Sequence, residues 1–355
     1  MGFYTGKKIL ITGGTGTIGR ALTRRLLKEN PEVVRILSRD EHKQFEMQQE
    51  LRGYDNIRFL IGDVRDADRL LRAMEDIDYV FHLAAMKHVP FCEYNPFEAV
   101  KTNVIGTQNV IHAAITANVE RVLFTSTDKA ISPTNTYGAT KLTAERLISA
   151  AEYHKGPRKT VFCSVRFGNV MGSRGSVIPL FVRQILEERR VTVTNPEMLR
   201  YMMTPGQAVE LILRANHMAY GGEVFVLKMP VVRLGDLAEV VVEETCREFG
   251  IRDPVRTDTI GLRPGEKMVE ELMTPDEAEA AMETREMYIL QPLFGITHPR
   301  VYPDVVDRTE LWPLLAAREP ISKETIRNWI AEENLIRKDV DGVARWTTDW
   351  TIKNY

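Results

Sequence analysis

Short apolar runs alternate with amphipathic stretches along the first half of the chain. Strand-like runs occupy residues 8–12, 33–37, 57–61, 79–83, 122–125 and 161–167. The segments between them, such as 18–28 and 44–51, have helical periodicity. Strands that alternate with helices in this way are typical of parallel sheets with right-handed crossovers. The pattern therefore predicts an α/β fold with a doubly wound parallel sheet and helices on both faces.

The alternation becomes less regular after residue 170. An apolar run at 224–227 and helical segments at 205–218 and 234–249 are separated by loops that contain Pro and Gly. Thr274 starts a capping-box sequence, TPDE, with Pro at the first helical position, so a helix should begin there. We expect a smaller C-terminal α/β lobe at the carboxyl edge of the sheet, where open parallel sheets bind ligands.

Composition narrows the class of protein. The 355 residues include 47 Lys+Arg and 49 Asp+Glu, with 44% hydrophobic residues, which is the balance of a folded chain. The formal net charge of −2 gives no electrostatic reason to expect nucleic acid or an anionic membrane as a partner. No run of about 18 apolar residues is present, so no membrane insertion is expected. Three scattered cysteines and the lack of a signal-peptide pattern favour a cytoplasmic location.

A Gly-rich turn joins the first apolar run to the first predicted helix. Residues 12–19 read TGGTGTIG, which fits the TGxxGxxG form of the dinucleotide fingerprint. Small residues let the backbone approach a pyrophosphate, whose charge lies at the helix N-terminus. A tight turn without a ligand is the alternative, but the position after the first strand favours a Rossmann-like dinucleotide site. The candidate cofactor contacts here are Gly13, Thr15, Gly16, Thr17, Ile18 and Gly19.

The end of the second strand bears on the choice of cofactor. Ser38 and Arg39 come first, Asp40 follows, and Lys43 lies one helical turn further on. A carboxylate here favours the ribose hydroxyls of NAD, whereas Arg or a hydroxyl favours the 2′-phosphate of NADP. We therefore predict NADP rather than NAD, although Asp40 would suit NAD. A solvated charged loop is the alternative.

Two later strand ends add candidate cofactor contacts. Asp63 and Val64 end the third strand, where an acid can accept a hydrogen bond from the adenine amino group. Ala84 and Ala85 end the fourth strand, where small side chains leave room for the ribose on the nicotinamide side. These positions extend the predicted cofactor site along the carboxyl edge of the sheet.

The candidate catalytic residues follow the fifth strand. Tyr137 and Lys141 are four residues apart and so share one face of a predicted helix. A nearby ammonium favours phenolate and should lower the tyrosine pKa from about 10 toward that of a working base. Ser126 and Thr127 end the fifth strand, where a hydroxyl could face the same substrate. A YxxxK spacing is common by chance, but its order after the Gly-rich loop favours a catalytic site.

Six motifs resemble one subgroup of the extended short-chain dehydrogenase/reductase family. They are AMKHVP at 85–90, STDKA at 126–130, YGATK at 137–141, RFGNV at 166–170, GSRGSV at 172–177 and GLRPGEK at 261–267. The subgroup is the nucleotide-sugar 4,6-dehydratases acting on UDP-N-acetylglucosamine, and within it the soluble, C5-inverting type used for pseudaminic acid. The resemblance covers residues 5–295. Large membrane-anchored relatives carry Met at the place of Tyr137 and a transmembrane region, so both differences favour the soluble type.

The resemblance implies internal hydride transfer on a tightly bound, recycled NADP, for surface glycan biosynthesis. Tyr137, assisted by Thr127 and Lys141, would take the proton of the sugar 4-hydroxyl while hydride leaves carbon 4. Lys129 would then remove the acidified proton on carbon 5, and Asp128 would protonate the departing 6-hydroxyl. Hydride returns to carbon 6 and gives a UDP-4-keto-6-deoxy-hexosamine. A surface ion pair or turn is the alternative for the acid and base.

The same resemblance implies contacts to the UDP-sugar. The candidate substrate residues are Lys87, Asn169, Arg174, Ser176, Val177, Arg263 and Glu266. Lys87 would also lie beside the cofactor, and the arginines suit bidentate phosphate contacts. A simple turn at 263–265 and a solvated loop at Arg174 remain alternatives.

Other polar and sulfur-containing residues favour structural roles. His82 and His88 lack metal-ligand spacing, so we predict no metal site. Met198, Met202 and Met203 are expected in the core rather than on a recognition surface.

We divide the chain into three predicted parts. Residues 1–170 form the NADP-binding Rossmann domain, to which a later strand can return, and residues 171–295 form the substrate-binding lobe. Residues 296–355 form a C-terminal extension without a readable role, in which 322–336 has the pattern of a capped amphipathic helix. A homo-oligomer is also expected.

Three functions remain open at this point. The first is the dehydratase, with inversion favoured over retention at carbon 5. The second is a nucleotide-sugar epimerase or reductase of the same fold, which would not need the adjacent Asp128 and Lys129. The third is a non-catalytic NADP-sensing regulator, in which Tyr137 or Lys141 would be expected to be lost.

Overall fold

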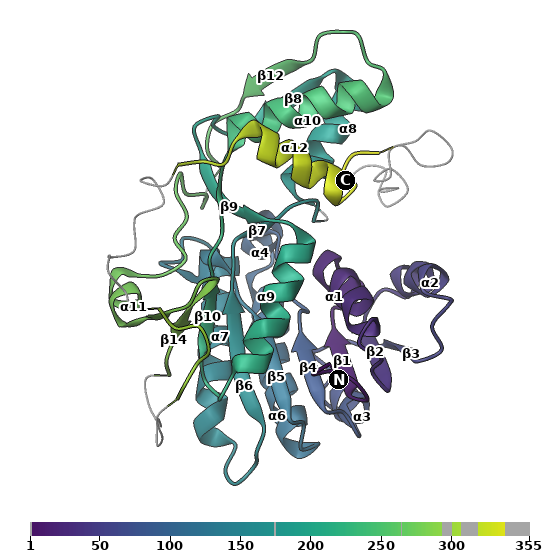
Figure 1. The fold of residues 1–355 in the computed structure, drawn as a ribbon, viewed down its shortest axis with the longest axis vertical. Helices are drawn as coiled ribbons and strands as arrows, with labels where there is room; N and C mark the ends of the chain where they lie inside the picture. Colours follow the sequence, from purple (N-terminus) through teal and green to yellow (C-terminus); the bar gives the residue numbers. More distant parts are fainter. Residues whose placement is uncertain (1, 174, 264, 293–299, 307–318, 338–355) are drawn as a thin grey trace. The chain divides into compact units, whose positions relative to one another are not determined.

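The computed structural model describes the chain except residues 1, 174, 264, 293–299, 307–318 and 338–355 (Figure 1). Backbone contacts divide it into two compact units. The first comprises Met1–Phe167, Ala208–Lys228 and Glu271–Trp312. The second comprises Gly168–Gln207, Met229–Glu270 and Pro313–Tyr355.

The first unit is built on a nine-stranded sheet with the order β13-β14-β10-β6-β5-β4-β1-β2-β3 (Figure 1). The strands from β10 to β3 in this order are all parallel. Strand β14 pairs antiparallel with β10, and β13 pairs antiparallel with β14. Their bounds are β1 (Lys8–Thr12), β2 (Val33–Ser38), β3 (Ile57–Ile61), β4 (Tyr79–His82), β5 (Arg121–Thr125), β6 (Val161–Arg166), β10 (Val224–Leu227), β13 (Met282–Glu283) and β14 (Met287–Leu290). The predicted Rossmann-like, doubly wound parallel sheet is confirmed.

The helices of this unit follow the strands in the predicted alternation. They are α1 (Thr17–Leu27), α2 (Glu41–Glu50), α3 (Ala67–Met74), α4 (Val89–Tyr94), α5 (Pro96–Ala99), the π-helix η1 (Val100–Ile105), α6 (Gly106–Thr116), the 3₁₀ helix η2 (Asp128–Ala130), α7 (Thr136–His154), α9 (Pro205–Met218) and α11 (Pro275–Ala280). Helix α2 begins before the predicted segment 44–51, because the side chain of Asp40 caps it by accepting a hydrogen bond from the Lys43 N–H.

The core of the first unit lies on both faces of the sheet. On one face, strand residues such as Leu10 and Val80 pack with apolar residues of α3, α6 and α7. Their neighbours Ile9 and Ile11 point to the other face and are fully buried as well. Helices α1 and α9 lie on that second face (Figure 1). Burial on both faces explains the almost continuous apolar runs in the central strands.

A buried ion-pair network joins β6, α7 and α11. The guanidinium of Arg166, at the end of β6, is fully buried and donates to Glu145 at 2.6 and 3.2 Å and to Glu277 at 2.7 and 3.1 Å. It also donates to the carbonyl of Leu272 at 2.9 Å. Glu277 belongs to the capping box of α11, which starts at Thr274 as predicted. Burial opposes the charge, but the two carboxylates raise the pKa of Arg166 above its usual range.

Two small sheets and three helices make up the described part of the second unit. Its sheets have the orders β11-β9-β7 and β12-β8. The bounds are β7 (Asn169–Val170), β8 (Arg190–Val193), β9 (Leu199–Met203), β11 (Val231–Arg233), β12 (Arg256–Thr259), α8 (Val177–Glu188), α10 (Leu234–Phe249) and α12 (Lys323–Glu332). Met198, Met202 and Met203 are buried as predicted. Helix α12 starts after its cap Ser322, within the segment predicted to be helical.

The compact units cut the chain differently from the predicted parts. Residues 208–228 and 271–312 belong to the first unit, although the predicted boundaries placed them after the dinucleotide-binding domain. The strand β10 pairs with β6 and so returns to the main sheet. An apolar run such as 224–227 shows that a strand is buried but not which partner it pairs with. The functional roles of 171–295 and 296–355 stay predictions.

We expect Arg166→Met to lower the free energy of unfolding by about 3–5 kcal/mol, because it leaves the buried Glu145 carboxylate without its cation. Urea unfolding at neutral pH measures this. The matched control is Arg24→Met, which removes an exposed pair with Glu50 and should cost about 0–1 kcal/mol. Equal losses in the two variants would contradict the role of the network.

Candidate functional site

The Gly-rich loop lies between β1 and α1. Gly13 has a φ of +69°, and a Cβ there would lie 2.8 Å from the backbone of Ala84 at the end of β4. A Cβ on Gly19 would lie 2.4 Å from the loop backbone. Helix α1 begins at Thr17, so its N-terminus directly follows this loop. This close backbone packing at a helix N-terminus fits a bound pyrophosphate.

The loop after β2 holds its acidic residue in a structural role. Asp40 accepts a hydrogen bond from the Lys43 N–H at 3.1 Å and pairs with the Lys43 ammonium at 2.9 Å. Burial acts in the other direction, but these contacts with Lys43 lower the pKa of Asp40 below its usual value. Ser38 accepts a hydrogen bond from Gln44 at 2.9 Å. The carboxylate that could suit the NAD ribose therefore also caps α2 and pairs with Lys43.

Arg39 differs from its neighbours because its side chain is 60% exposed. One of its nitrogens lies 3.8 Å from Asp63, which also pairs with Arg65 at 2.7 Å. Partial burial acts against ionisation, but Arg65 and Arg39 hold the pKa of Asp63 below its usual value. Val64 beside it is buried. The ends of β2 and β3 thus present a cation and an ionised acid together.

The acid and base candidates follow β5 directly. Thr127 donates a hydrogen bond to Asp128 Oδ1 at 2.9 Å, and the Lys129 ammonium donates to the same oxygen at 3.0 Å. The Asp128 side chain is 0% exposed, and its Oδ2 has no hydrogen-bond partner in the described part of the chain. The Lys129 side chain is 22% exposed. The pair is therefore a half-buried ion pair rather than a surface one.

Tyr137 and Lys141 lie on α7, which Asn135 caps by accepting from the Gly138 N–H at 2.9 Å. The Lys141 ammonium donates to the carbonyl of Thr125 at 2.5 Å. Burial lowers the pKa of Lys141 to about 7. Burial also raises the pKa of Tyr137 to about 12, although a hydrogen bond with Thr127 and the charge of Lys129 oppose it.

The prediction that the pKa of Tyr137 is lowered is wrong for the protein without bound ligands. The spacing in the sequence suggested that the Lys141 ammonium would favour the phenolate. In the structure, burial disfavours both charged forms, so it raises the pKa of Tyr137 and lowers that of Lys141. A phenolate at Tyr137 therefore depends on hydrogen bonds and charges that counteract burial, and the spacing of Tyr137 and Lys141 alone does not provide it.

Sequence reasoning missed Asn103, which lies in the π-helix η1 and is buried. Its amide accepts from the Met86 N–H at 2.8 Å, and donates to the Met86 carbonyl at 3.0 Å and to Thr140 at 3.0 Å. It thereby links Met86, between Ala85 and Lys87, to helix α7. The sequence gives little signal for it, because the neighbouring Lys101 and Thr102 are polar as well.

The predicted substrate residues of the second unit lie on two segments. Asn169 lies in β7, while Ser176 and Val177 start α8. Arg263 is exposed, and its backbone exchanges hydrogen bonds with Glu266, at 3.1 Å to the backbone N–H and 3.3 Å to the carboxylate. Arg174 lies outside the described residues.

A second residue that sequence reasoning missed supports the 263–268 loop. Arg200 is buried in β9 and donates to the carbonyls of Lys267 at 2.7 Å and Met268 at 3.0 Å. It also lies 3.6 Å from Glu266. Nothing in its sequence context separates it from a surface arginine.

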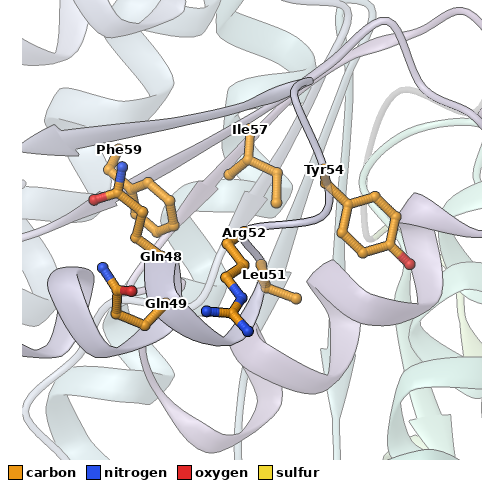
Figure 2. A pocket seen from close by; sticks show the side chains of 7 residues that line it. All are labelled: Gln48, Gln49, Leu51, Arg52, Tyr54, Ile57 and Phe59. Atoms are coloured by element: carbon orange, nitrogen blue, oxygen red, sulfur yellow. The ribbon is translucent and has the colours of Figure 1, made fainter.

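Other features lie apart from these residues. A surface hollow at the end of α2 and the start of β3 is lined by Gln48, Gln49, Leu51, Arg52, Tyr54, Ile57 and Phe59 (Figure 2). Because Ile57 begins its strand, the hollow lies at the amino end of the parallel sheet, opposite the end where such sheets bind ligands. In the part of the chain that is described, no three His, Cys, Asp or Glu side chains are grouped to hold a metal.

Comparison with known proteins identifies the family. Residues 9–292 match the profile of the family described as "Polysaccharide biosynthesis protein". The chain belongs to this family. None of the helices described in the structure has the length and apolar character needed to cross a membrane.

Two members with named activities cover most of the chain. The UDP-N-acetylglucosamine 4,6-dehydratase (inverting) of Campylobacter jejuni subsp. jejuni serotype O:23/36 is 40% identical over 291 residues, which is 81% of this chain and 84% of that one. The UDP-glucose 4-epimerase of Rickettsia typhi is 42% identical over 282 residues, which is 78% of this chain and 81% of that one. The predicted resemblance to the dehydratases is confirmed, and these relatives are enzymes of UDP-sugars.

Solved structures share the fold. The X-ray structure of Pen from Bacillus thuringiensis is 54% identical with a TM-score of 0.87, and the match covers 94% of this chain and 100% of that one. MoeE5 in complex with UDP-glucose and NAD is 25% identical with a TM-score of 0.61, over 73% of this chain and 87% of that one. A structural neighbour therefore carries a nicotinamide dinucleotide and a UDP-sugar on this fold.

The pKa of Lys141 predicts a dependence of stability on pH. Above pH 7 the folded protein has lost this proton while the unfolded chain keeps it up to about pH 10. The free energy of unfolding should therefore rise by about 2 kcal/mol between pH 7 and pH 9 through this group. Lys141→Met should lose this increase in urea unfolding, whereas the exposed Lys159→Met should keep it. The same slope in Lys141→Met and wild type would refute the assignment.

Proposed function

We propose that this chain is an NADP-dependent UDP-N-acetylglucosamine 4,6-dehydratase, a lyase that inverts carbon 5. The observation that carries the proposal is the Asp128–Lys129 pair beside Tyr137. Removal of water needs an acid and a base in addition to the tyrosine that serves oxidation at carbon 4. The relative named as an inverting dehydratase supports the same reaction.

The residues of this chain divide the proton transfers between them. Tyr137 would take the proton of the 4-hydroxyl, and Lys129 would take the proton of carbon 5. Asp128, whose Oδ2 has no hydrogen-bond partner in the described residues, would protonate the departing 6-hydroxyl. Moving one proton within the Lys129–Asp128 hydrogen bond turns ammonium and carboxylate into the amine and acid that this elimination requires. NADP held at the Gly13 loop would supply the hydride chemistry for carbons 4 and 6.

The protons of the cycle balance only when carbon 5 is included. Tyr137 and Lys129 each gain one proton, and Asp128 gives one to the departing water. Inversion then requires one proton for carbon 5 from the face opposite Lys129, and the proton held by Tyr137 is the one left for it. Lys129 ends as ammonium and Asp128 as carboxylate, which is the ion pair of the structure. Thr127 donates to Asp128 Oδ1 and so stabilises that carboxylate.

The cofactor choice rests on the loop after β2. A side chain at Gly13 would collide with the backbone of Ala84, and this close packing of the loop supports a bound dinucleotide. Asp40 is engaged as a helix cap and by Lys43, which argues against its use for the NAD ribose. Arg39 is exposed and would bind the 2′-phosphate of NADP.

The remaining assignments complete the proposal. The proposed cofactor and catalytic residues are the ones that the sequence predicts. They include Lys87, in the loop after β4. In the second unit Asn169, Arg174, Ser176, Val177, Arg263 and Glu266 would contact the UDP-sugar. A cytoplasmic homo-oligomer is proposed, with no nucleic-acid partner. A UDP-sugar 4-epimerase is the second candidate function, and the relative named UDP-glucose 4-epimerase supports it.

Incubation with UDP-N-acetylglucosamine, followed by mass spectrometry and early proton NMR, tests the reaction. We expect loss of one water, a new methyl signal from carbon 6, no net reduction of NADP, and coupling constants of an inverted carbon 5. Lys129→Ala should abolish the loss of water while it keeps cofactor binding. Lys7→Ala, which removes an ion pair with Glu120, should behave as wild type. Unchanged mass with altered stereochemistry would identify an epimerase. Equal rates of water loss in Lys129→Ala and wild type would refute the role of Lys129 as the base.

A second test concerns the cofactor. Arg39→Ala should weaken NADP binding by about tenfold or more, because a charge-assisted contact to the 2′-phosphate is lost, while NAD binding changes little. Fluorescence titration with both dinucleotides measures this. The control Arg58→Ala changes an exposed arginine on β3 and should affect neither. Equal weakening of NADP and NAD would contradict the role of Arg39.

A further inference from the structure

A fully buried histidine connects the strand before the phosphate loop to the helix layer. His82, the last residue of β4, places Nδ1 2.7 Å from the hydroxyl of Thr12, the last residue of β1. Its Nε2 lies 3.1 Å from the hydroxyl of Thr107 on α6. All three side chains are 0% exposed. Thr12 directly precedes Gly13, so this contact starts at the predicted cofactor loop.

The hydrogen bonds around His82 define where each proton lies. Thr107 donates its only hydroxyl proton to the carbonyl of Asn103 at 2.6 Å. Its oxygen can then only accept from His82, which requires a proton on Nε2. Nδ1 carries the lone pair and accepts from Thr12. Burial lowers the pKa of His82 to about 3, so the ring stays neutral at physiological pH.

The chain continues from Asn103 to the catalytic helix. The π-helix η1 contains Asn103, and its side chain holds both backbone groups of Met86 and the hydroxyl of Thr140. Thr140 donates in turn to the carbonyl of Tyr137 at 2.9 Å. A π-turn in a helix often marks a functional position, because the extra residue redirects a side chain.

We propose that His82 and Thr107 are positioning residues, which hold the Gly13 loop, the 84–87 segment and the Tyr137 helix at fixed spacing. The chain touches each of the three segments to which the proposed reaction assigns the cofactor or the tyrosine. Its members are buried, so water cannot replace a lost link without cost. None of them is assigned a contact with substrate or cofactor. The proposal rests on the proposed function only for its kinetic readout.

The test compares Thr107→Val with Thr107→Ser and with a matched control in full-length protein. The control is Thr23→Val on α1, because Thr23 is also 0% exposed and its hydroxyl also donates to the carbonyl four residues earlier, at 2.8 Å. Hydrogen–deuterium exchange reports the Met86 N–H, which the Asn103 side chain protects. We expect about tenfold faster exchange there in Thr107→Val only, with wild-type exchange in Thr107→Ser.

Kinetics with UDP-N-acetylglucosamine provide the second readout. Thr107→Val should lower kcat by about tenfold while KM stays within about twofold, because geometry rather than binding is lost. Thr107→Ser should restore kcat, and Thr23→Val should keep it. Exchange and kcat in Thr107→Val that match Thr23→Val would overturn the proposal.

The protonation of His82 gives a test that needs no variant. Long-range proton–nitrogen NMR of the wild-type protein should show His82 with its proton on Nε2. The nitrogen chemical shifts of the ring should stay the same between pH 5 and pH 9. A proton on Nδ1, or titration in this range, would overturn the proposal even if Thr107→Val does not fold. A wild-type protein without dehydratase activity would refute the proposed function, while the exchange and NMR results would still decide on the network.

Discussion

The structure of the first unit depends on a cation that cannot reach water. Arg166 is fully buried between Glu145 and Glu277, so its charge is stabilised chiefly by these two carboxylates. A buried guanidinium without carboxylates would be expensive, and the carboxylates without it would be too. These ion pairs hold the end of β6 against α7 and α11. Glu145 lies one helical turn after Lys141, so the same network anchors the helix that carries the candidate tyrosine and lysine.

Burial then decides the chemistry of that helix. It acts against charge on both Tyr137 and Lys141, and it thereby moves their pKa values in opposite directions, to about 12 and about 7. The polar groups that oppose burial come from the segment after β5, where Thr127 and Lys129 lie. The acid and base candidates are therefore also part of the tyrosine's electrostatic environment. A change in one of them should alter more than one proton transfer.

Much of the fold and of the candidate site could be predicted from local patterns. The apolar runs located the parallel strands to within one or two residues, because strands buried on both faces have almost no polar positions. TPDE located the start of α11, since a capping box satisfies helix N–H groups within four residues. The Gly-rich loop and the YxxxK spacing are equally local. Helix α2 was placed late because Asp40 was considered as a ligand contact rather than as a cap.

Interactions between distant segments were beyond such patterns. The sequence by itself determined the order of strands and helices, the glycine loop, and the residue types available for catalysis, because these depend on neighbours along the chain. Only the tertiary structure decided that β10 returns to β6, that Asn103 reaches Met86 and Thr140, and that Lys141 loses much of its affinity for a proton. The physical reason is that desolvation and buried hydrogen bonds depend on what surrounds a group in space. A residue's position in the chain does not specify those surroundings.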